Sequence, residues 1–265
     1  MGAGALPAAA SPRTLTVHPV ESIQKAANAA RAGDTVLVQA GTYRESVTVK
    51  TSGLTLRGVG PRPVIVPPEK KSAPSTKGAI CCVEGGKGVR VVGLRNKPVA
   101  NVTVSDLKVP GFSSAGLCSL ATDRLTVQRP GPRRTAGGTS RRSAGLIVIG
   151  DENKPRAGAL TINGNQVLTT TSTAPGRLGC RSCRAWASCW PVTHDVVAGD
   201  SGWSSLSGGI VPFRSFVGAV NEKNRVDENW ITANVPAGLV SRNAAKGSNL
   251  FRGNFRRVSI PAGLC

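Results

Sequence analysis

Acidic residues, aromatic residues and long apolar runs are scarce in this sequence. Its 265 residues hold 14 Asp and Glu against 34 Lys and Arg, only 4% are aromatic, and two are histidine. No run of 18 or more apolar residues occurs, which excludes a membrane-spanning helix. Because the acids do not cluster and imidazoles are few, we expect no bound metal ion and no cofactor.

Helical periodicity is also scarce, and only one stretch of the sequence shows it clearly. Apolar residues recur there at i, i+3, i+4 and i+7, namely Ile23, Ala26, Ala27 and Ala30. Glu21 or Ser22 can cap the start of this helix, and Gly33 can supply a left-handed end. A parallel α/β sheet needs a crossover helix after each strand, so a single helix argues against that fold class.

Glycine and proline are abundant, at 32 and 18 residues, and they separate short apolar runs along the chain. The runs include VLV (36–38), VTV (47–49), LTL (54–56), VTV (102–104), LTV (125–127), LIVI (146–149) and LTI (160–162). Many short strands joined by tight turns predict an all-β fold.

Two sequence marks repeat along the chain in the same phase. A small-residue turn before an apolar run occurs at Gly116, Gly145, Gly209, Gly238 and Gly263. The pattern apolar-x-x-Asn occurs at 162–165, 226–229 and 251–254. The step from the second glycine to the third equals the step between the first two asparagine marks. This shared phase predicts a solenoid with rungs of about 20 to 30 residues.

Short strands at that rung length predict a right-handed parallel β-helix, in which each rung stacks its inward side chains on those of its neighbours. The ends of such a column expose strand edges that must be covered. We therefore expect residues 23–30 to form an N-terminal α-helical cap, with the alanine face closing the first rung.

The stretch SIQKAANAARAGDTVLVQAGTYRESVTV (22–49) resembles the cap and first rung of right-handed parallel β-helix proteins of the pectin-lyase-like superfamily. It is similar to the same region of pectinesterases and of the copper-accessory proteins of nitrous oxide reductase. The later repeat marks are similar to those of exported actinobacterial β-helix proteins. The resemblance covers 18–127 and 207–265, and it implies the fold more specifically than any one activity.

The domain organisation follows from where the repeat holds. Residues 1–17 are interpreted as a leader or the remnant of a signal peptide, and 18–265 as one β-helix domain. The cap and first rung occupy 18–60, and the C-terminal rungs occupy 207–265. Between them, 128–206 is rich in Arg, Cys and Trp and breaks the pattern. That stretch is interpreted as ordinary loops, as a basic grip for a polyanion, or as sequence translated out of frame.

Cysteine usage and charge indicate the location and the partner. The seven cysteines have no zinc-site spacing beyond a lone Cys180-x-x-Cys183, so we expect a few disulfides in a secreted or extracytoplasmic protein. Their pairing stays open. The net charge of +20 favours a polyanion as partner, and we expect a polysaccharide, with an acidic one among the options, rather than nucleic acid. We also expect a monomer.

No residue is assigned a catalytic role from the sequence. The adjacent acids of 151–152 and 227–228 would point to opposite faces of a strand, which argues against a paired-carboxylate site and favours solvated turn residues. A pectinesterase-like GNVDFIFG stretch is absent. His18 is interpreted as a surface residue, and His194 lies in the anomalous stretch.

Asparagine and tryptophan supply the remaining candidates. Asn165, Asn229 and Asn254 are interpreted as stacked turn residues that bond rung to rung, rather than as sugar ligands. Trp230 lies next to one of these turns and is the candidate substrate-binding residue, because an exposed indole can stack on a sugar ring.

Three functions are compatible with these observations. The first is an exported β-helix protein that binds or processes polysaccharide on its lateral face; if it is an enzyme, a polysaccharide lyase or another carbohydrate-active enzyme is expected. The second is a non-catalytic structural or interaction module. The third, weaker, is a periplasmic copper-accessory protein.

Overall fold

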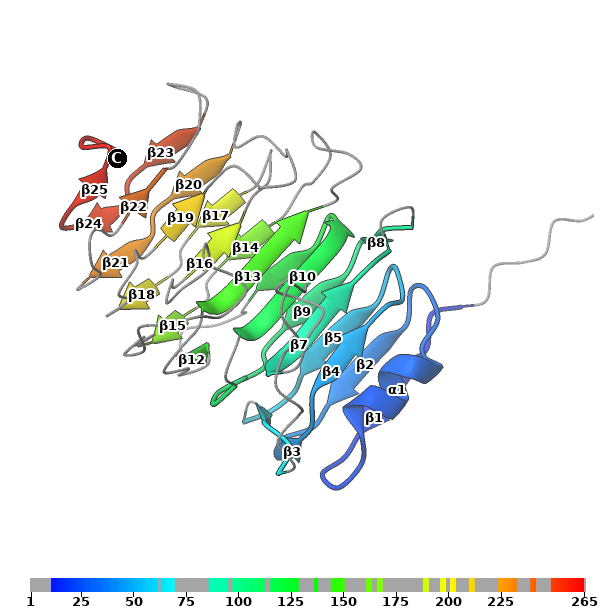
Figure 1. Cartoon of the computed structure of the whole chain (residues 1–265). Helices are drawn as coiled ribbons and strands as arrows, with labels where there is room; N and C mark the ends of the chain where they lie inside the picture. The colour runs from blue at the N-terminus through cyan, green and yellow to red at the C-terminus, as the bar shows by residue number, and fades with distance from the viewer. Residues whose placement is uncertain are drawn as a thin grey trace, which may run out of the picture.

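Parallel sheets form the body of the molecule, and successive strands follow one another from the blue N-terminal end to the red C-terminal end of a column (Figure 1). The computed structural model describes residues 11–61, 63–69, 86–94, 97–112, 115–128, 136–137, 144–150, 161–163, 166–168, 188–190, 196–198, 201–203, 210–212, 224–232, 239–241 and 249–264. Every ladder between the labelled strands in this part of the chain is parallel.

Three long sheets and one short pair contain these strands. The first sheet comprises β1 (Thr14–Val17), β2 (Thr35–Val38), β5 (Thr55–Gly58), β9 (Thr103–Ser105), β11 (Thr126–Gln128), β14 (Thr161–Asn163), β17 (Val196–Ala198), β20 (Arg225–Asp227) and β23 (Leu250–Arg252). The second comprises β4 (Val47–Val49), β7 (Lys87–Val92), β10 (Ala115–Asp123), β13 (Ala144–Gly150), β16 (Ser188–Trp190), β19 (Ile210–Pro212), β22 (Leu239–Val240) and β25 (Ser259–Ile260), with β8 (Val99–Ala100) paired to β10. The third comprises β12 (Ala136–Gly137), β15 (Gln166–Leu168), β18 (Ser201–Trp203), β21 (Trp230–Thr232) and β24 (Phe255–Arg256), and β3 (Thr42–Arg44) pairs with β6 (Val64–Val66).

The chain visits the three long sheets in strict rotation. From β10 onward, consecutive strands belong to the second, first and third sheet in turn, and the cycle repeats until β25. Parallel pairing between strands one full turn apart is the definition of a parallel β-helix. The predicted all-β class and the parallel β-helix are therefore confirmed.

The repeat marks correspond to strand register. Leu117 of β10 pairs with Leu146 of β13, so the first two glycine marks are one rung apart. Leu146 then pairs with Ser188, and Ser188 with Ile210, so the interval between the second and third glycine marks contains two rungs.

Rung length varies along the column. The step from Leu239 to its partner Ser259 is less than half as long as the step from Leu56 to its partner Val104. The predicted upper limit of about 30 residues per rung is therefore too low. Insertions between strands lengthen a rung without shifting its register, so the longer rungs still stack on their neighbours.

The core is a column of aliphatic side chains on the inner faces of the sheets. Val36, Leu56, Val104 and Val127 pair in register along the first sheet, and all four are buried. The preceding outward position holds threonine in each of these strands, namely Thr35, Thr55, Thr103 and Thr126. Alternation along each strand therefore sends aliphatic residues inward and threonines outward, as the pleat requires.

Helix α1 (Ile23–Ala29) packs against β1 and β2, the first two strands of the first sheet, and against β4, the outermost described strand of the second sheet. Ser22 is its N-cap, and the Ser22 hydroxyl accepts a hydrogen bond from the Lys25 N–H at 3.2 Å. Of the predicted face, Ile23, Ala27 and Ala30 are buried in the core, and Ala26 is partly buried against it. The prediction that Gly33 ends the helix is wrong, because the helix already ends at Ala29 and the left-handed Gly33 (φ +89°) lies in the turn that follows.

Two segments that the sequence interpretation set apart from the regular rungs contain strands in the structure. Thr14–Val17, which the sequence interpretation grouped with the leader, is strand β1 and pairs with β2. The anomalous stretch 128–206 contains β13, β14 and β17, which pair in register with rungs on both sides. The described backbone of that stretch therefore belongs to the same column, whereas Cys180, Cys183 and His194 lie outside the described residues.

Candidate functional site

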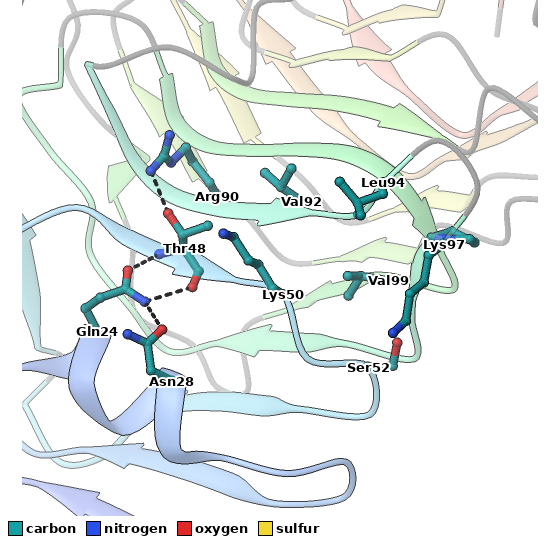
Figure 2. Close-up of a pocket in the computed structure, with 12 residues that line it drawn as sticks. Gln24, Asn28, Thr48, Lys50, Ser52, Arg90, Val92, Leu94, Lys97 and Val99 are labelled. Atoms are coloured by element: carbon teal, nitrogen blue, oxygen red, sulfur yellow. Dashed lines mark hydrogen bonds between the residues drawn. The ribbon is translucent and has the colours of Figure 1, made fainter.

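A groove of about 690 Å³ opens on the outer face of the second sheet, beside helix α1 (Figure 2). Its walls come from α1, from the end of β4, from β7 and from the segment that leads into β8. The lining residues are Gln24, Asn28, Thr48, Lys50, Ser52, Arg90, Val92, Gly93, Leu94, Lys97, Pro98 and Val99.

Strand alternation places the polar side chains of the groove. Thr48 of β4 pairs with Arg90 of β7, and the preceding pair, Val47 and Val89, is fully buried. Side chains alternate across a sheet, so Thr48 and Arg90 point outward side by side. Lys50 follows β4 at the next outward position and lines the same groove.

Leu94 and Lys97 form the rim opposite helix α1 and are joined by two backbone hydrogen bonds. The Leu94 N–H donates to the Lys97 carbonyl at 2.9 Å, and the Lys97 N–H donates to the Leu94 carbonyl at 3.0 Å. The two bonds hold Lys97 and the exposed Leu94 across the groove from Asn28 (Figure 2). Ser52 supports the base of this rim, because its hydroxyl accepts a hydrogen bond from the Ala100 N–H at 3.1 Å.

Helix α1 joins the opposite wall through the side chain of Gln24. The Gln24 amide oxygen accepts from the Thr48 N–H at 2.6 Å, and its nitrogen donates to the Thr48 carbonyl at 3.0 Å. The same nitrogen donates to Asn28 Oδ1 at 2.9 Å. The Thr48 hydroxyl in turn accepts from Arg90 Nη2 at 2.6 Å. One hydrogen-bonded chain therefore runs from the helix to the guanidinium (Figure 2).

The electrostatic character of the groove is cationic. Lys50, Arg90 and Lys97 line it, and no carboxylate is present among the lining residues that the structure describes. Glu45, an acid close in sequence to this wall, is engaged elsewhere: its carboxylate accepts from the Ile23 and Gln24 N–H groups at 2.8 and 3.1 Å. Amides, hydroxyls and three cations together suit a ligand with carboxylates and many hydroxyl groups.

The sequence interpretation missed this groove. Its cations come from three separate short segments, and nothing local distinguishes Lys50, Arg90 or Lys97 from other basic residues in a chain with 34 of them. One sequence signal could have indicated the groove. In VTVK (47–50) and VRVV (89–92), a cation occupies an outward position of the strand pattern, next to buried valines.

Two solved structures have a similar arrangement of the chain. An alginate lyase from Paenibacillus sp. str. FPU-7 is 14% identical, and the match covers 92% of this chain and 99% of that one with a TM-score of 0.44. The pectate lyase Pel9A is 12% identical, with coverage of 93% and 80% and a TM-score of 0.36. No family model and no curated protein matches the sequence. Likeness at this level assigns no role to any residue of the groove.

Trp230, the residue predicted to bind substrate, does not line the groove. It lies on β21 in the third sheet, near the other end of the column (Figure 1). Its indole is half-exposed and stacks on the Phe255 ring, with centroids 4.0 Å apart and an interplanar angle of 17°. The two residues pair in register, so the stack joins adjacent rungs.

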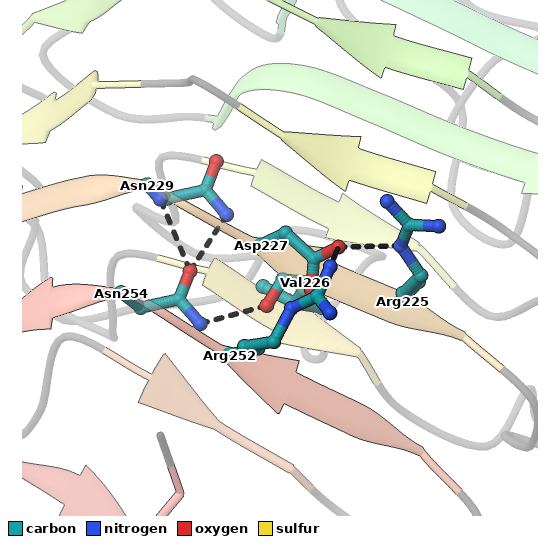
Figure 3. A network of polar contacts seen from close by, with 6 residues as sticks. All are labelled: Arg225, Val226, Asp227, Asn229, Arg252 and Asn254. Atoms are coloured by element: carbon teal, nitrogen blue, oxygen red, sulfur yellow. Dashed lines mark hydrogen bonds and ion pairs between the residues drawn. The ribbon is translucent and has the colours of Figure 1, made fainter.

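The predicted asparagine ladder is present in the last turns (Figure 3). The Asn254 side-chain oxygen accepts from the Asn229 backbone N–H at 3.1 Å and from Asn229 Nδ2 at 2.8 Å. Asn254 Nδ2 donates to the Val226 carbonyl at 2.7 Å. Both asparagines are buried, so they bond rung to rung as expected and are shielded from a ligand. Asn165 lies outside the described residues.

Asp227 is not the solvated turn residue that the sequence suggested. Its carboxylate is buried at the edge of the same network, in contact with Arg225 and 3.5 Å from Arg252 Nη2 (Figure 3). Glu228 is exposed and adopts a left-handed conformation, with φ of +53°. Asp227 therefore neutralises two exposed arginines, and the other acid pair, 151–152, lies outside the described residues.

Within the described residues, no three His, Cys, Asp or Glu side chains gather where they could hold a metal ion. His18 is exposed, as predicted, and its backbone N–H donates to Glu21 Oε2 at 2.7 Å. Cys118 of β10 is buried and belongs to a disulfide. No described helix is long and apolar enough to cross a membrane.

Proposed function

We propose that this chain is an exported β-helix protein that binds an acidic, uronate-bearing polysaccharide in the groove between α1, β4 and β7. The observation that carries the proposal is the lining itself: three cations, four amide or hydroxyl side chains and no described carboxylate. Uronate residues present one planar carboxylate and several hydroxyls each. Arginine binds such carboxylates through paired hydrogen bonds, and lysine adds a compact positive charge.

The groove also has the apolar surface that a sugar ring needs. Val92, Pro98 and Val99 contribute to its lining between the polar groups, and Leu94 is exposed at the rim. Sugar rings present C–H faces as well as hydroxyls, so a mixed lining suits them better than a purely charged patch would.

The proposed export is supported by cysteine chemistry. Cys118 is buried in β10 and disulfide-bonded, and structural disulfides persist in oxidising compartments outside the cytoplasm. We further propose that α1 closes the N-terminal opening of the column. The buried Ile23 and Ala27, and the bonds from Gln24 to the outermost described strand of the second sheet, support that role.

The binding test compares two doubly substituted variants of equal charge. Lys50→Ala/Lys97→Ala removes two groove cations, and Lys25→Ala/Arg257→Ala removes two exposed cations outside the groove. We expect the first variant to lose about tenfold or more in affinity for oligogalacturonate, and the second to stay within about twofold. Equal losses would show that net charge alone attracts the polymer, and the groove proposal would then be abandoned.

An ultraviolet absorbance assay on the same purified protein distinguishes a lyase from a non-catalytic binding module. Lyase action on polygalacturonate, alginate or hyaluronan creates unsaturated ends that absorb in the ultraviolet, whereas binding without such a signal identifies a non-catalytic module. The copper-accessory alternative requires metal to remain on the protein after loading with copper and dialysis.

Trp230 is a separate proposal as a sugar-stacking residue, supported by its half-exposed indole. Since Trp230 lies on another sheet from the groove, Trp230→Ala should weaken binding of long polymers while leaving a short oligogalacturonate unaffected. Equal binding of long polymers by the variant and the unmodified protein would remove Trp230 from the binding surface.

A further inference from the structure

The hydrogen bonds that link Gln24, Thr48 and Arg90 do more than cover the outer edge of β4. Gln24 bonds both backbone groups of Thr48, at 2.6 and 3.0 Å, as a neighbouring strand would. In the described sheet β4 is an outermost strand, so these bonds cover part of its edge. They also fix Thr48 relative to the helix, and the Thr48 hydroxyl accepts a hydrogen bond from Arg90.

We propose that Gln24 and Thr48 are positioning residues that hold the Arg90 guanidinium ready to bind a ligand carboxylate. This inference rests on the proposed function of the groove. The bond from Arg90 Nη2 to the Thr48 hydroxyl, at 2.6 Å, restricts one side of the guanidinium and thereby its plane. An arginine binds a carboxylate well only when two of its N–H groups face the two oxygens together, so restricting the plane raises affinity.

The two lysines of the groove do not need such a device. Lys50 and Lys97 carry compact charges on flexible stems and attract any anion nearby. Arg90 is half-buried and leaves strand β7 beside Thr48, so the hydroxyl and the guanidinium share one outward register position. The geometry thus assigns different roles to these cations. The two lysines attract the anionic ligand, and the Gln24–Thr48–Arg90 chain orients the guanidinium that binds its carboxylate.

A double-mutant cycle tests this assignment. Thr48→Val keeps the shape of the side chain and leaves the Gln24 bonds to the Thr48 backbone in place, while removing the hydroxyl that accepts from Arg90 Nη2. With oligogalacturonate as the probe, we expect Thr48→Val to weaken binding about fivefold, and Thr48→Ser to stay near the unmodified protein. In an Arg90→Ala background, Thr48→Val should have no further effect, since its role is exercised through Arg90.

Two control measurements, the melting temperature and the binding of an uncharged ligand, distinguish a positioning role of Thr48 from a role in folding. The melting temperature of Thr48→Val should stay within a few degrees of the unmodified protein, and fully methyl-esterified oligogalacturonate should bind both proteins equally weakly. Gln24→Met should repeat the Thr48→Val result; if that variant unfolds, the Thr48 cycle alone decides.

The outcomes distinguish the two proposals. Loss of binding in Lys50→Ala/Lys97→Ala together with unchanged binding in Thr48→Val would overturn the positioning role and leave the groove intact. Additive effects of Thr48→Val and Arg90→Ala would overturn it as well. If the unmodified protein binds no uronate oligosaccharide, the proposed function fails and this inference fails with it.

Discussion

At the scale of single residues, Asp34 shows how the first turn of the column is held. Its carboxylate is buried and accepts from Arg13 Nη2 at 2.6 Å, from Arg13 Nε at 3.1 Å, and from the Arg13 and Arg31 N–H groups at 2.8 Å each. The Arg13 guanidinium and these N–H groups lower the pKa of Asp34 well below its usual range, against the opposing effect of burial.

This shift predicts an acid-dependent loss of stability. The folded-state pKa of Asp34 is below the unfolded value of about 4, so the carboxylate contributes its full stability above that pH. The contribution disappears as the pH falls through the interval between the two values. Asp34→Asn should therefore lower the melting temperature at pH 7 and flatten its decline below about pH 4.

Thermal melts of both proteins between pH 7 and pH 2 measure the effect. Glu69→Gln is a suitable control, because the Glu69 carboxylate is exposed and lies 3.6 Å from Arg44 in a surface ion pair. Parallel pH profiles for the unmodified protein and Asp34→Asn would contradict the assignment.

The asparagine ladder gives a second residue-scale prediction. Asn254→Ala removes the oxygen that accepts from two donors of Asn229 and the donor to the Val226 carbonyl, all in a buried turn. We expect a loss of about 2 to 4 kcal/mol in the free energy of unfolding. Asn254→Asp retains the acceptor but places a carboxylate oxygen against the Val226 carbonyl, so it should also lose stability. Urea denaturation measures both, and an alanine variant as stable as the unmodified protein would refute the role of the ladder.

At the scale of elements, helix α1 both packs on the first strands and forms a wall of the groove. Ile23 is fully buried among the first rung residues, and Ala27 is nearly so. Ile23→Ala should therefore cost about 2 to 5 kcal/mol in unfolding free energy, because a buried side chain is lost and a cavity remains. Lys25→Ala, on the exposed face of the same helix, should change stability by less than about 0.5 kcal/mol. Urea denaturation compares the two variants, and equal losses would contradict the packing of this face.

The existence of this helix was readable from the sequence, and part of its anchoring was not. The spacing of Ile23 and Ala27 identifies the buried face because local periodicity reports which side of a helix packs. Glu45 satisfies the first N–H groups from 22 residues away, at a distance that no local capping rule covers. The early end at Ala29 was missed because the backbone is already extended at Ala30 (φ −74°, ψ 144°), before the glycine at which a local rule ends the helix.

At the scale of the whole molecule, the solenoid was predictable because its repeat appears in sequence as well as in space. Leu117 and Leu146 share a mark and a register, and the asparagines at 229 and 254 share a ladder. Rung length was less predictable, since an insertion such as the one between Leu56 and Val104 adds residues without changing which strands pair.

The groove, in contrast, arises only once the column is assembled. Thr48 and Arg90 are neighbours because β4 and β7 are consecutive strands of one sheet, although they are far apart in the chain. Helix α1 and the paired residues Leu94 and Lys97 line the same place from further parts of the sequence. A single aromatic residue such as Trp230 is the easier candidate to find from sequence, because its chemistry is visible without any knowledge of its neighbours.

Hydrogen–deuterium exchange with and without oligogalacturonate tests the location of the proposed site most directly. We predict slower exchange in peptides that cover 23–29, 47–52 and 87–99, and unchanged exchange in 224–232 and 249–264. Protection confined to the C-terminal turns, or none at all at saturating oligogalacturonate, would contradict a binding groove beside α1.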